Sequence, residues 1–273
     1  MAKTKKTEET PMELTVESLM SAGFTQEDAE AIVGSNSTSG GGLPYPLIKV
    51  NYDLTIPELA KFGDFVSITE KDDNGDTTSL INFGDRLHVV ILASVFQYSR
   101  YNAATNSADI SSNLFPMKDT KKAIDLKTGK RIADLKKNDP DNKIKYQEIM
   151  LLLVSSDSQP EPKPYIFYNK GAFMYSFGQC RKPLTNRGAV MYNIEFGLKQ
   201  ERKGKTKYFV VDENTFVATP RTLEEIKEGA TIIPAYIKAF NDWVDSVNSG
   251  ADSKPTKETP VYEEEDDDDE IAF

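Results

Sequence analysis

Positively charged side chains lie next to aromatic rings in three segments of the chain. Single-stranded nucleic acid needs both groups, because cations neutralise phosphates and flat rings stack on unpaired bases, at about 1–3 kcal/mol per base. The sequence therefore predicts DNA contacts at twelve residues of these segments, which are Tyr98, Arg100, Tyr101, Tyr175, Arg181, Lys182, Arg187, Lys199, Arg202, Lys203, Lys205 and Tyr208.

A further basic stretch lies between the first and second of these segments. Residues 117–145 hold ten Lys or Arg side chains and five Asp side chains. Lysine-rich loops are common at protein surfaces, so the pattern alone predicts a mobile basic insertion in the body of the protein.

The C-terminal residues form an acidic run with an apolar end. Without the eight acids of this run, the formal net charge changes from -10 to -2, and residues 40–240 alone carry 28 bases and 24 acids. Like charges repel one another and little apolar surface can be buried, so we predict a disordered tail. The tail can compete with phosphates for a basic groove, while its apolar end can enter a pocket of a partner. Its residues are Glu263, Glu264, Glu265, Asp266, Asp267, Asp268, Asp269, Glu270, Ile271, Ala272 and Phe273.

The residue types that enzymes use are scarce. The chain has one cysteine, Cys180, and one histidine, His88, which excludes an internal disulfide and the zinc sites made of four cysteines or of two cysteines and two histidines. Gly204-Lys205-Thr206 imitates the end of a phosphate-binding loop, but Lys199 occupies the position of the first glycine that this loop requires. We predict no catalytic residue, no cofactor and no metal site.

One enzyme alternative is a metal-dependent nuclease. Pro140-Asp141 and Glu161-Pro162-Lys163 superficially match a restriction-type motif, in which the second acid and the lysine lie on a strand and position a metal and a water. Pro162 and Pro164 oppose strand pairing, so we predict a loop at this place, which argues against the nuclease.

The composition changes along the chain and divides it into four parts. Residues 1–12 are polar and predicted to be disordered, and 13–42 combine a short helical hairpin with a Ser/Gly linker. Residues 43–248 form the predicted body, and 249–273 the disordered linker and acidic tail. No run of 18 apolar residues and no apolar stretch after the charged N-terminus occurs, so we predict no membrane segment, no secretory signal and a cytoplasmic location.

Alternating and continuous apolar runs predict a body rich in strands. We expect strands near 65–69, 87–96, 149–154, 165–168, 173–177, 190–199 and 208–211. Thr222 and Glu225 form a capping-box pattern, and a helix is expected from about 234 to 247, ended by Ser249-Gly250. The predicted fold class is mainly β with flanking helices, in the form of an OB-fold-like small barrel.

The sequence of residues 266–273, Asp-Asp-Asp-Asp-Glu-Ile-Ala-Phe, resembles the C-terminal tip of bacterial and bacteriophage single-stranded DNA-binding proteins. The bacterial tip typically reads Asp-Asp-Asp-Ile-Pro-Phe, so the present one differs by Glu270 and by Ala272 in place of proline. The resemblance covers about eight to thirteen residues. The β-rich, mildly basic body is similar to the phage-type members, which implies an OB-fold without catalytic activity.

The resemblance implies a protein that coats exposed single strands during phage DNA replication and recombination. Its tail would occupy the DNA groove when DNA is absent, and would recruit a polymerase, helicase or recombinase when displaced. For a phage-encoded chain, the location would be the cytoplasm of the bacterial host. The alternative is an acidic interaction or DNA-mimic protein, which would use the tail to bind a basic partner and would ignore nucleic acid.

Overall fold

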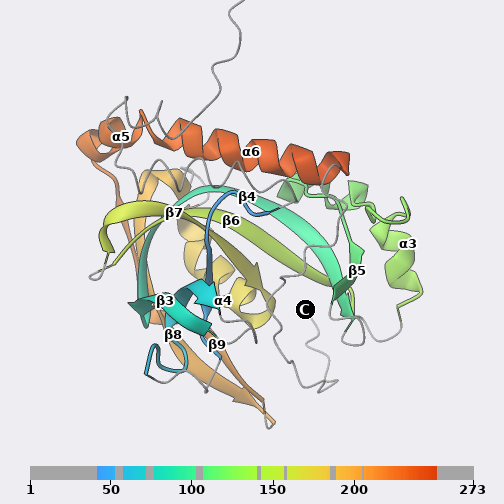
Figure 1. The fold of residues 1–273 in the computed structure, drawn as a ribbon, viewed down its shortest axis with the longest axis horizontal. Helices are drawn as coiled ribbons and strands as arrows, with labels where there is room; N and C mark the ends of the chain where they lie inside the picture. The colour runs from blue at the N-terminus through green and yellow to red at the C-terminus, as the bar shows by residue number, and fades with distance from the viewer. Residues whose placement is uncertain are drawn as a thin grey trace, which may run out of the picture.

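The computed structural model describes residues 42–52, 58–71, 77–102, 107–139, 143–156, 159–184, 189–204 and 206–250 (Figure 1). The strands within these ranges are β1 (Leu47–Val50), β2 (Phe65–Lys71), β3 (Thr77–Gly84), β4 (Arg86–Asn102), β5 (Ser107–Ser111), β6 (Lys145–Ser156), β7 (Gln159–Lys170), β8 (Tyr192–Lys203) and β9 (Thr206–Pro220). The helices are the 3-10 helices η1 (Met117–Lys122), η2 (Lys182–Leu184) and η3 (Ala189–Met191), and the α-helices α3 (Ile132–Lys137), α4 (Gly171–Arg181), α5 (Leu223–Gly229) and α6 (Ile233–Ser249).

All the described strands belong to one mixed sheet. Its order is β3-β2-β1-β7-β6-β4-β8-β9, and β5 pairs with β4 beside this path. The β1–β7 pair is parallel and the other pairs are antiparallel. The predicted mainly β class with flanking helices is confirmed. The path of described strands ends at β3 and at β9 and does not close on itself.

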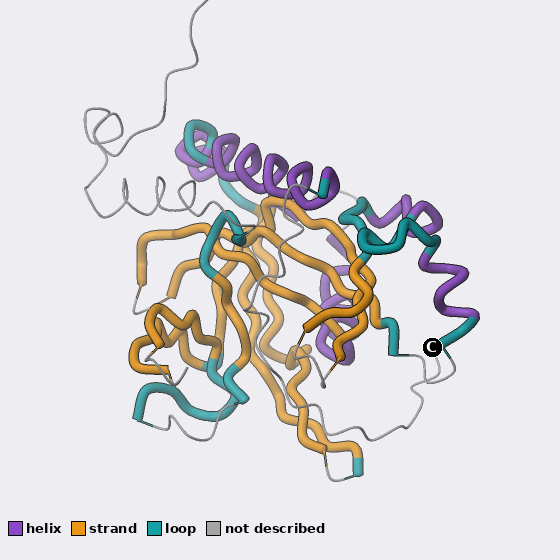
Figure 2. The backbone as a smooth tube through the Cα atoms, turned by 45° about the vertical axis from the view of Figure 1, so that its right-hand side comes forward, coloured by secondary structure: helices purple, strands orange, loops and turns teal. Residues whose placement is uncertain are grey.

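The central strands are buried on both faces, which explains their nearly continuous apolar runs. In β6, Met150 and Leu152 belong to the core on one face, which α4 covers with Phe173 and Phe177. Leu151 belongs to the core on the opposite face, which α6 covers. Figure 2 shows α6 lying across the sheet as a long helix, while the β8–β9 hairpin projects away from it. We call the two sides of the sheet the α4 face and the α6 face.

Most of the predicted elements are confirmed. The strands near 87–96 and 149–154 lie within β4 and β6, and those near 190–199 and 208–211 correspond to β8 and β9, which form a hairpin. Thr222 and Glu225 form the capping box at the start of α5. The last helix ends at Gly250, whose φ of 73° is left-handed. The predicted helical hairpin within 13–42 and the acidic tail lie outside the described residues.

The strand predicted at 173–177 is wrong, because these residues lie in helix α4. Rings at alternate positions indicated a strand, but the two buried rings, Phe173 and Phe177, are four residues apart and point to the same side of a helix. Tyr175, between them, is 57% exposed. The helix begins at Gly171, whose φ of 57° turns the chain sharply after β7.

The proline-rich loop predicted at 160–164 is also wrong, because these residues are part of β7. Ile166 donates its backbone N–H to Pro46, on the side of β7 away from β6. Because the N–H direction alternates along a strand, Pro160, Pro162 and Pro164 lack their N–H groups on that same side. No described strand pairs with them there, so β7 accommodates the prolines without losing bonds to β6.

The stretch predicted as a mobile basic insertion has a hydrophobic core of its own. Phe96, Ile110, Phe115, Ala123, Ile132 and Ile144 form this core. Asp125 is buried and accepts bonds from the backbone N–H groups of Ser111, at 3.1 Å, and Thr128, at 2.9 Å. Asn248 of α6 exchanges two bonds with the backbone of Leu114. We call residues 107–139 and 143–145 the basic module.

A glycine is required where the chain turns into β2. Gly63 has a φ of 96°, and a Cβ atom at this position would lie 2.6 Å from the ring of Phe209. That ring packs against Tyr52 and Phe62, at centroid distances of 5.5 and 5.2 Å, so it has little freedom to move.

We expect Gly63→Ala to lower the free energy of unfolding by about 3 kcal/mol, from backbone strain and overpacking together. Gly84→Ala is the matched control. Gly84 also has a positive φ, of 78°, but has nothing within 4 Å of the new Cβ, so only about 1–2 kcal/mol is expected. Urea unfolding of both variants measures the difference, and equal losses would contradict the close approach to Phe209.

Candidate nucleic-acid interface

The basic module presents a positively charged surface. All ten of its Lys and Arg side chains between 117 and 145 are exposed; they are Lys118, Lys121, Lys122, Lys127, Lys130, Arg131, Lys136, Lys137, Lys143 and Lys145. Of the nearby acids, Asp125 is buried, while Asp119 and Asp134 pair with Lys122 and Lys137, at 2.7 and 3.3 Å. The cations therefore exceed the carboxylates that could balance them.

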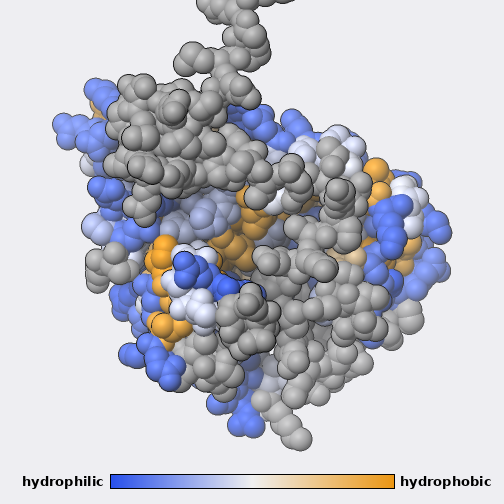
Figure 3. All heavy atoms as spheres, in the orientation of Figure 1, coloured by the Kyte–Doolittle hydropathy of each residue, from blue (hydrophilic) through white to orange (hydrophobic). Residues whose placement is uncertain are grey.

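Apolar side chains lie exposed among these cations. Met117 is 69% exposed, and Ile124 and Leu126 are exposed as well. Figure 3 shows the mixture at the right-hand end of the molecule, over α3, where hydrophilic residues surround a few hydrophobic ones. A surface of this composition can bind phosphates through its charges and can contact the attached sugars and bases through its apolar side chains.

The end of β4 brings two of the predicted rings to this module. Tyr98 packs against Tyr146 and Phe115, with centroid distances of 4.9 and 5.9 Å, and Lys136 lies 4.9 Å from the centre of its ring. Burial raises the pKa of the Tyr98 phenol. Tyr101, near the end of the strand, is 41% exposed. Of these two rings, Tyr101 is therefore the better placed to stack on a base.

Arg100 lies between these two tyrosines in the sequence and pairs through two guanidinium nitrogens with Asp109 of β5. Its Nε lies 2.9 Å from Oδ1 and its Nη2 lies 2.8 Å from Oδ2 of that carboxylate. The hydrogen bonds from Arg100 hold the pKa of Asp109 below its ordinary value. Arg100 thus joins β4 to β5 with its charge balanced, and its predicted phosphate contact would compete with Asp109.

Arg181 on α4 has a buried partner. Its guanidinium pairs with Glu148 of β6, which is 1% exposed and also accepts a bond from Asn169 at 2.8 Å. The guanidinium carbon lies 5.1 Å from the centre of the Phe177 ring. This pair attaches the C-terminal end of α4 to the sheet. Lys182, the next residue, is exposed, whereas Arg187 lies outside the described residues.

The hairpin end of β8 and β9 carries the third predicted group. Glu201 pairs with Lys199 at 3.3 Å and accepts a bond from the hydroxyl of Tyr208 at 3.2 Å. Arg202 is exposed, and its Nε donates to the backbone oxygen of Gly204 at 2.7 Å. Lys203 is exposed, and Lys205 lies outside the described part of the chain.

The structure does not make one surface from the three predicted groups, although α4, which carries one of them, contacts β9 and β6. Helix α4 packs on β9, where the N–H of Val211 donates to the hydroxyl of Ser176 at 3.0 Å. Its other end reaches Glu148, which lies opposite Phe96 on β4. Three of the predicted cations in these groups, however, have carboxylate partners. The largest excess of positive charge lies in the basic module. The sequence predicted the basic composition of the module but not its hydrophobic core.

The residues of the nuclease alternative are only partly described. Glu161 and Lys163 are exposed on β7, on a strand and not in the predicted loop, and Asp141 lies outside the described residues. Within the described ranges, no group of three or more His, Cys, Asp or Glu side chains is arranged to hold a metal ion.

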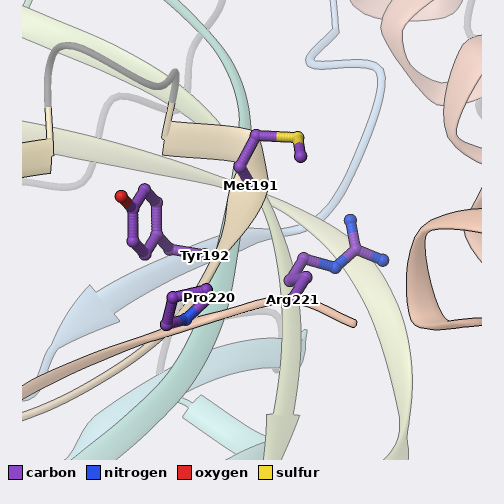
Figure 4. Close-up of a pocket in the computed structure, with 4 residues that line it drawn as sticks. All are labelled: Met191, Tyr192, Pro220 and Arg221. Atoms are coloured by element: carbon purple, nitrogen blue, oxygen red, sulfur yellow. The ribbon is translucent and has the colours of Figure 1, made fainter. Parts of the chain in front are cut away.

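Two neighbouring cavities lie on another part of the molecule. The smaller, of about 320 Å³, is lined by Met191, Tyr192, Pro220 and Arg221 (Figure 4). The larger, of about 740 Å³, shares Arg221 and includes His88 and Glu195. His88 Nδ1 lies 3.8 Å from Glu195, which also pairs with Arg86 at 3.1 Å. Neither cavity contains any of the predicted DNA contacts.

Comparison of the chain with protein-family models, with curated proteins and with solved structures gave no match. None of the described helices combines the length and the apolar character needed to cross a membrane.

Proposed function

We propose that this chain binds single-stranded DNA with little sequence preference, through the basic module and the end of β4. The observation that carries the proposal is the exposure of all ten module cations on a core that fixes their positions. Electrostatic contact with phosphates supplies affinity without reading bases. The biological role would be to protect strands exposed during phage DNA replication and recombination.

Single strands are favoured over duplex because rings and apolar side chains accompany the cations. Tyr101 is exposed at the end of β4, and Met117 and Leu126 are exposed within the module. Unpaired bases can contact such groups, whereas paired bases in a duplex are already stacked. The OB-fold-like barrel belongs to this proposal. β4 supports it, because its 17 residues pair with β5, β6 and β8 and so join these strands into one β-rich unit.

The acidic tail would regulate this binding. Eight consecutive carboxylates can compete with phosphates for the module, and the apolar end, residues 271–273, can enter a pocket of a polymerase, helicase or recombinase. Displacement of the tail by DNA would then make it accessible to such a partner.

Truncation after Tyr262 tests both parts of the proposal. We expect the truncated protein to bind oligo-dT more tightly than the full chain at low salt, because the competing polyanion is absent. The difference should shrink as salt screens the tail. Fluorescence-quenching titrations of both proteins at several salt concentrations measure the effect.

A control variant keeps the length of the tail and replaces its acids 263–270 with Asn and Gln; it should behave like the truncation. Identical affinity of all three proteins at every salt concentration would contradict the regulatory role. Equal binding of a matching duplex would contradict the preference for single strands.

A further inference from the structure

The larger cavity is a trough across the α6 face of the sheet. Side chains from β4, β6, β7, β8 and β9 line it, and α5 with the first turn of α6 forms its wall. Val90, Leu153 and Ile233 give it an apolar floor, and these residues belong to the α6-face core or pack against it. Val217 and Ile232, which also line the trough, are exposed. The apolar surface therefore remains accessible to an incoming side chain.

The charged groups that line the trough are mainly acidic. They are Glu195, Glu225 and Glu228, against one guanidinium, that of Arg221. Arg221 donates to the backbone oxygens of Val190, at 3.3 Å, and Glu225, at 2.7 Å. Glu228 is exposed, and no other described residue pairs with it. A polyanion is disfavoured here, while a cation attached to an apolar group is favoured.

The opposite composition occurs on η1 of the basic module. Met117 is the most exposed large apolar side chain of the described residues, and Lys118 and Lys121 are exposed beside it. Among the described residues, neither lysine has a carboxylate partner, in contrast to Lys122, which pairs with Asp119. Met117, with these two lysines beside it, matches an apolar floor whose wall carries the unpaired carboxylate of Glu228.

These two surfaces cannot meet within one molecule. Helix α6 begins at the wall of the trough, with Ile233, and its C-terminal end is bonded to the module through Asn248 and Leu114. Its 17 residues span about 25 Å at 1.5 Å per residue. Figure 1 shows α5 and α3 beyond opposite ends of this helix. The packed helix keeps the two surfaces apart.

We propose that the chain associates head to tail with a second copy of itself, with η1 of one copy seated in the trough of the next. Met117 enters the apolar floor, and Lys118 and Lys121 face the carboxylates of the wall. The two surfaces differ, so the contact is heterologous, and each added copy leaves one trough and one η1 available. Met117, Lys118 and Lys121 also belong to the proposed DNA-binding surface, but the association itself does not need DNA, and it is therefore tested without DNA.

Sedimentation velocity of the full chain without DNA tests the proposal. We expect the wild type to sediment faster as its concentration rises. Glu228→Lys and Lys121→Glu should each weaken the association on the order of tenfold, because each turns an attraction into a repulsion. An equimolar mixture of the two variants should associate again, since in the mixed contacts every module meets a trough of opposite charge. Met117→Ala should weaken the association without changing the charge.

Glu70→Lys is the control, because Glu70 is exposed on β2, outside both surfaces, and the substitution changes the charge equally. It should leave the association intact. The proposal is overturned by a wild type that remains monomeric at all concentrations, by single variants that associate as the wild type does, or by a mixture that stays dissociated. A Glu70→Lys effect as large as that of Glu228→Lys would also overturn it.

Discussion

Replacing four lysines of the basic module with glutamate should weaken binding to oligo-dT on the order of 10²- to 10³-fold at low salt. The four are Lys127, Lys130, Lys136 and Lys145, which are exposed and have no carboxylate partner among the described residues. If each neutralises one phosphate, the slope of log affinity against log salt should fall by about 3, at about 0.7 per phosphate of a single strand. Fluorescence titrations over a salt series give both quantities.

A control variant carries the same change in net charge elsewhere. Lys61, Lys71, Lys163 and Lys227 are exposed and lie outside the module. Their replacement by glutamate should lower the affinity less than tenfold and leave the salt slope nearly unchanged, because only long-range repulsion is added. If both variants lose affinity equally, binding depends on net charge and the proposed interface is wrong.

Arg181→Ala should lower the free energy of unfolding by about 3–5 kcal/mol, because it leaves the carboxylate of Glu148 buried without its partner. Burial at 1% exposure makes Glu148 sensitive to this loss, as water cannot replace the guanidinium. Urea unfolding followed by circular dichroism measures the change. The double variant Glu148→Leu/Arg181→Met should recover only part of the loss, because apolar residues can replace the buried ion pair but the buried amide of Asn169 loses its acceptor.

The same variants separate the structural role of Arg181 from its predicted contact with phosphate. Under conditions where it is folded, the double variant should bind oligo-dT with the salt slope of the wild type, because the charge of Arg181 is balanced by Glu148 in the protein. A slope lower by about 0.7 would instead indicate a phosphate contact by Arg181. A small loss of stability in Arg181→Ala would contradict the importance of the buried pair.

Local patterns predicted much of the fold because they act over few residues. Strands β4 and β6 are buried on both faces and therefore have continuous apolar runs. Strand β8 is buried mainly on one face and therefore alternates between apolar and polar residues. The side chains of Thr222 and Glu225 each accept a hydrogen bond from the backbone N–H of the other residue. Because the two residues are only three positions apart, the sequence predicts the start of α5. The order of the strands and the open form of the sheet depend on pairings between residues far apart in the sequence, such as Leu47 with Ile166. No local sequence pattern indicates such pairings.

The errors arose where tertiary contacts outweigh local preference. Phe173 and Phe177 satisfy a strand pattern and a helix pattern, and packing on the α4 face selects the helix. The module has few apolar residues in sequence, but Phe96 of β4, which lies outside it, completes its core. For the candidate site, the sequence predicts only which positively charged residues and aromatic rings are present. Which cations already have partners, such as Arg100 with Asp109, depends on strand pairing.

The three prolines of β7 have a consequence for the protein at high concentration. An exposed strand normally offers a row of backbone donors that a strand of another molecule can use, which is how fibrous aggregates begin. Pro160, Pro162 and Pro164 remove those donors from the open side of β7 while its bonds to β6 persist. This part of β7 therefore resists template-like growth, so a strand of another molecule cannot extend the sheet along it.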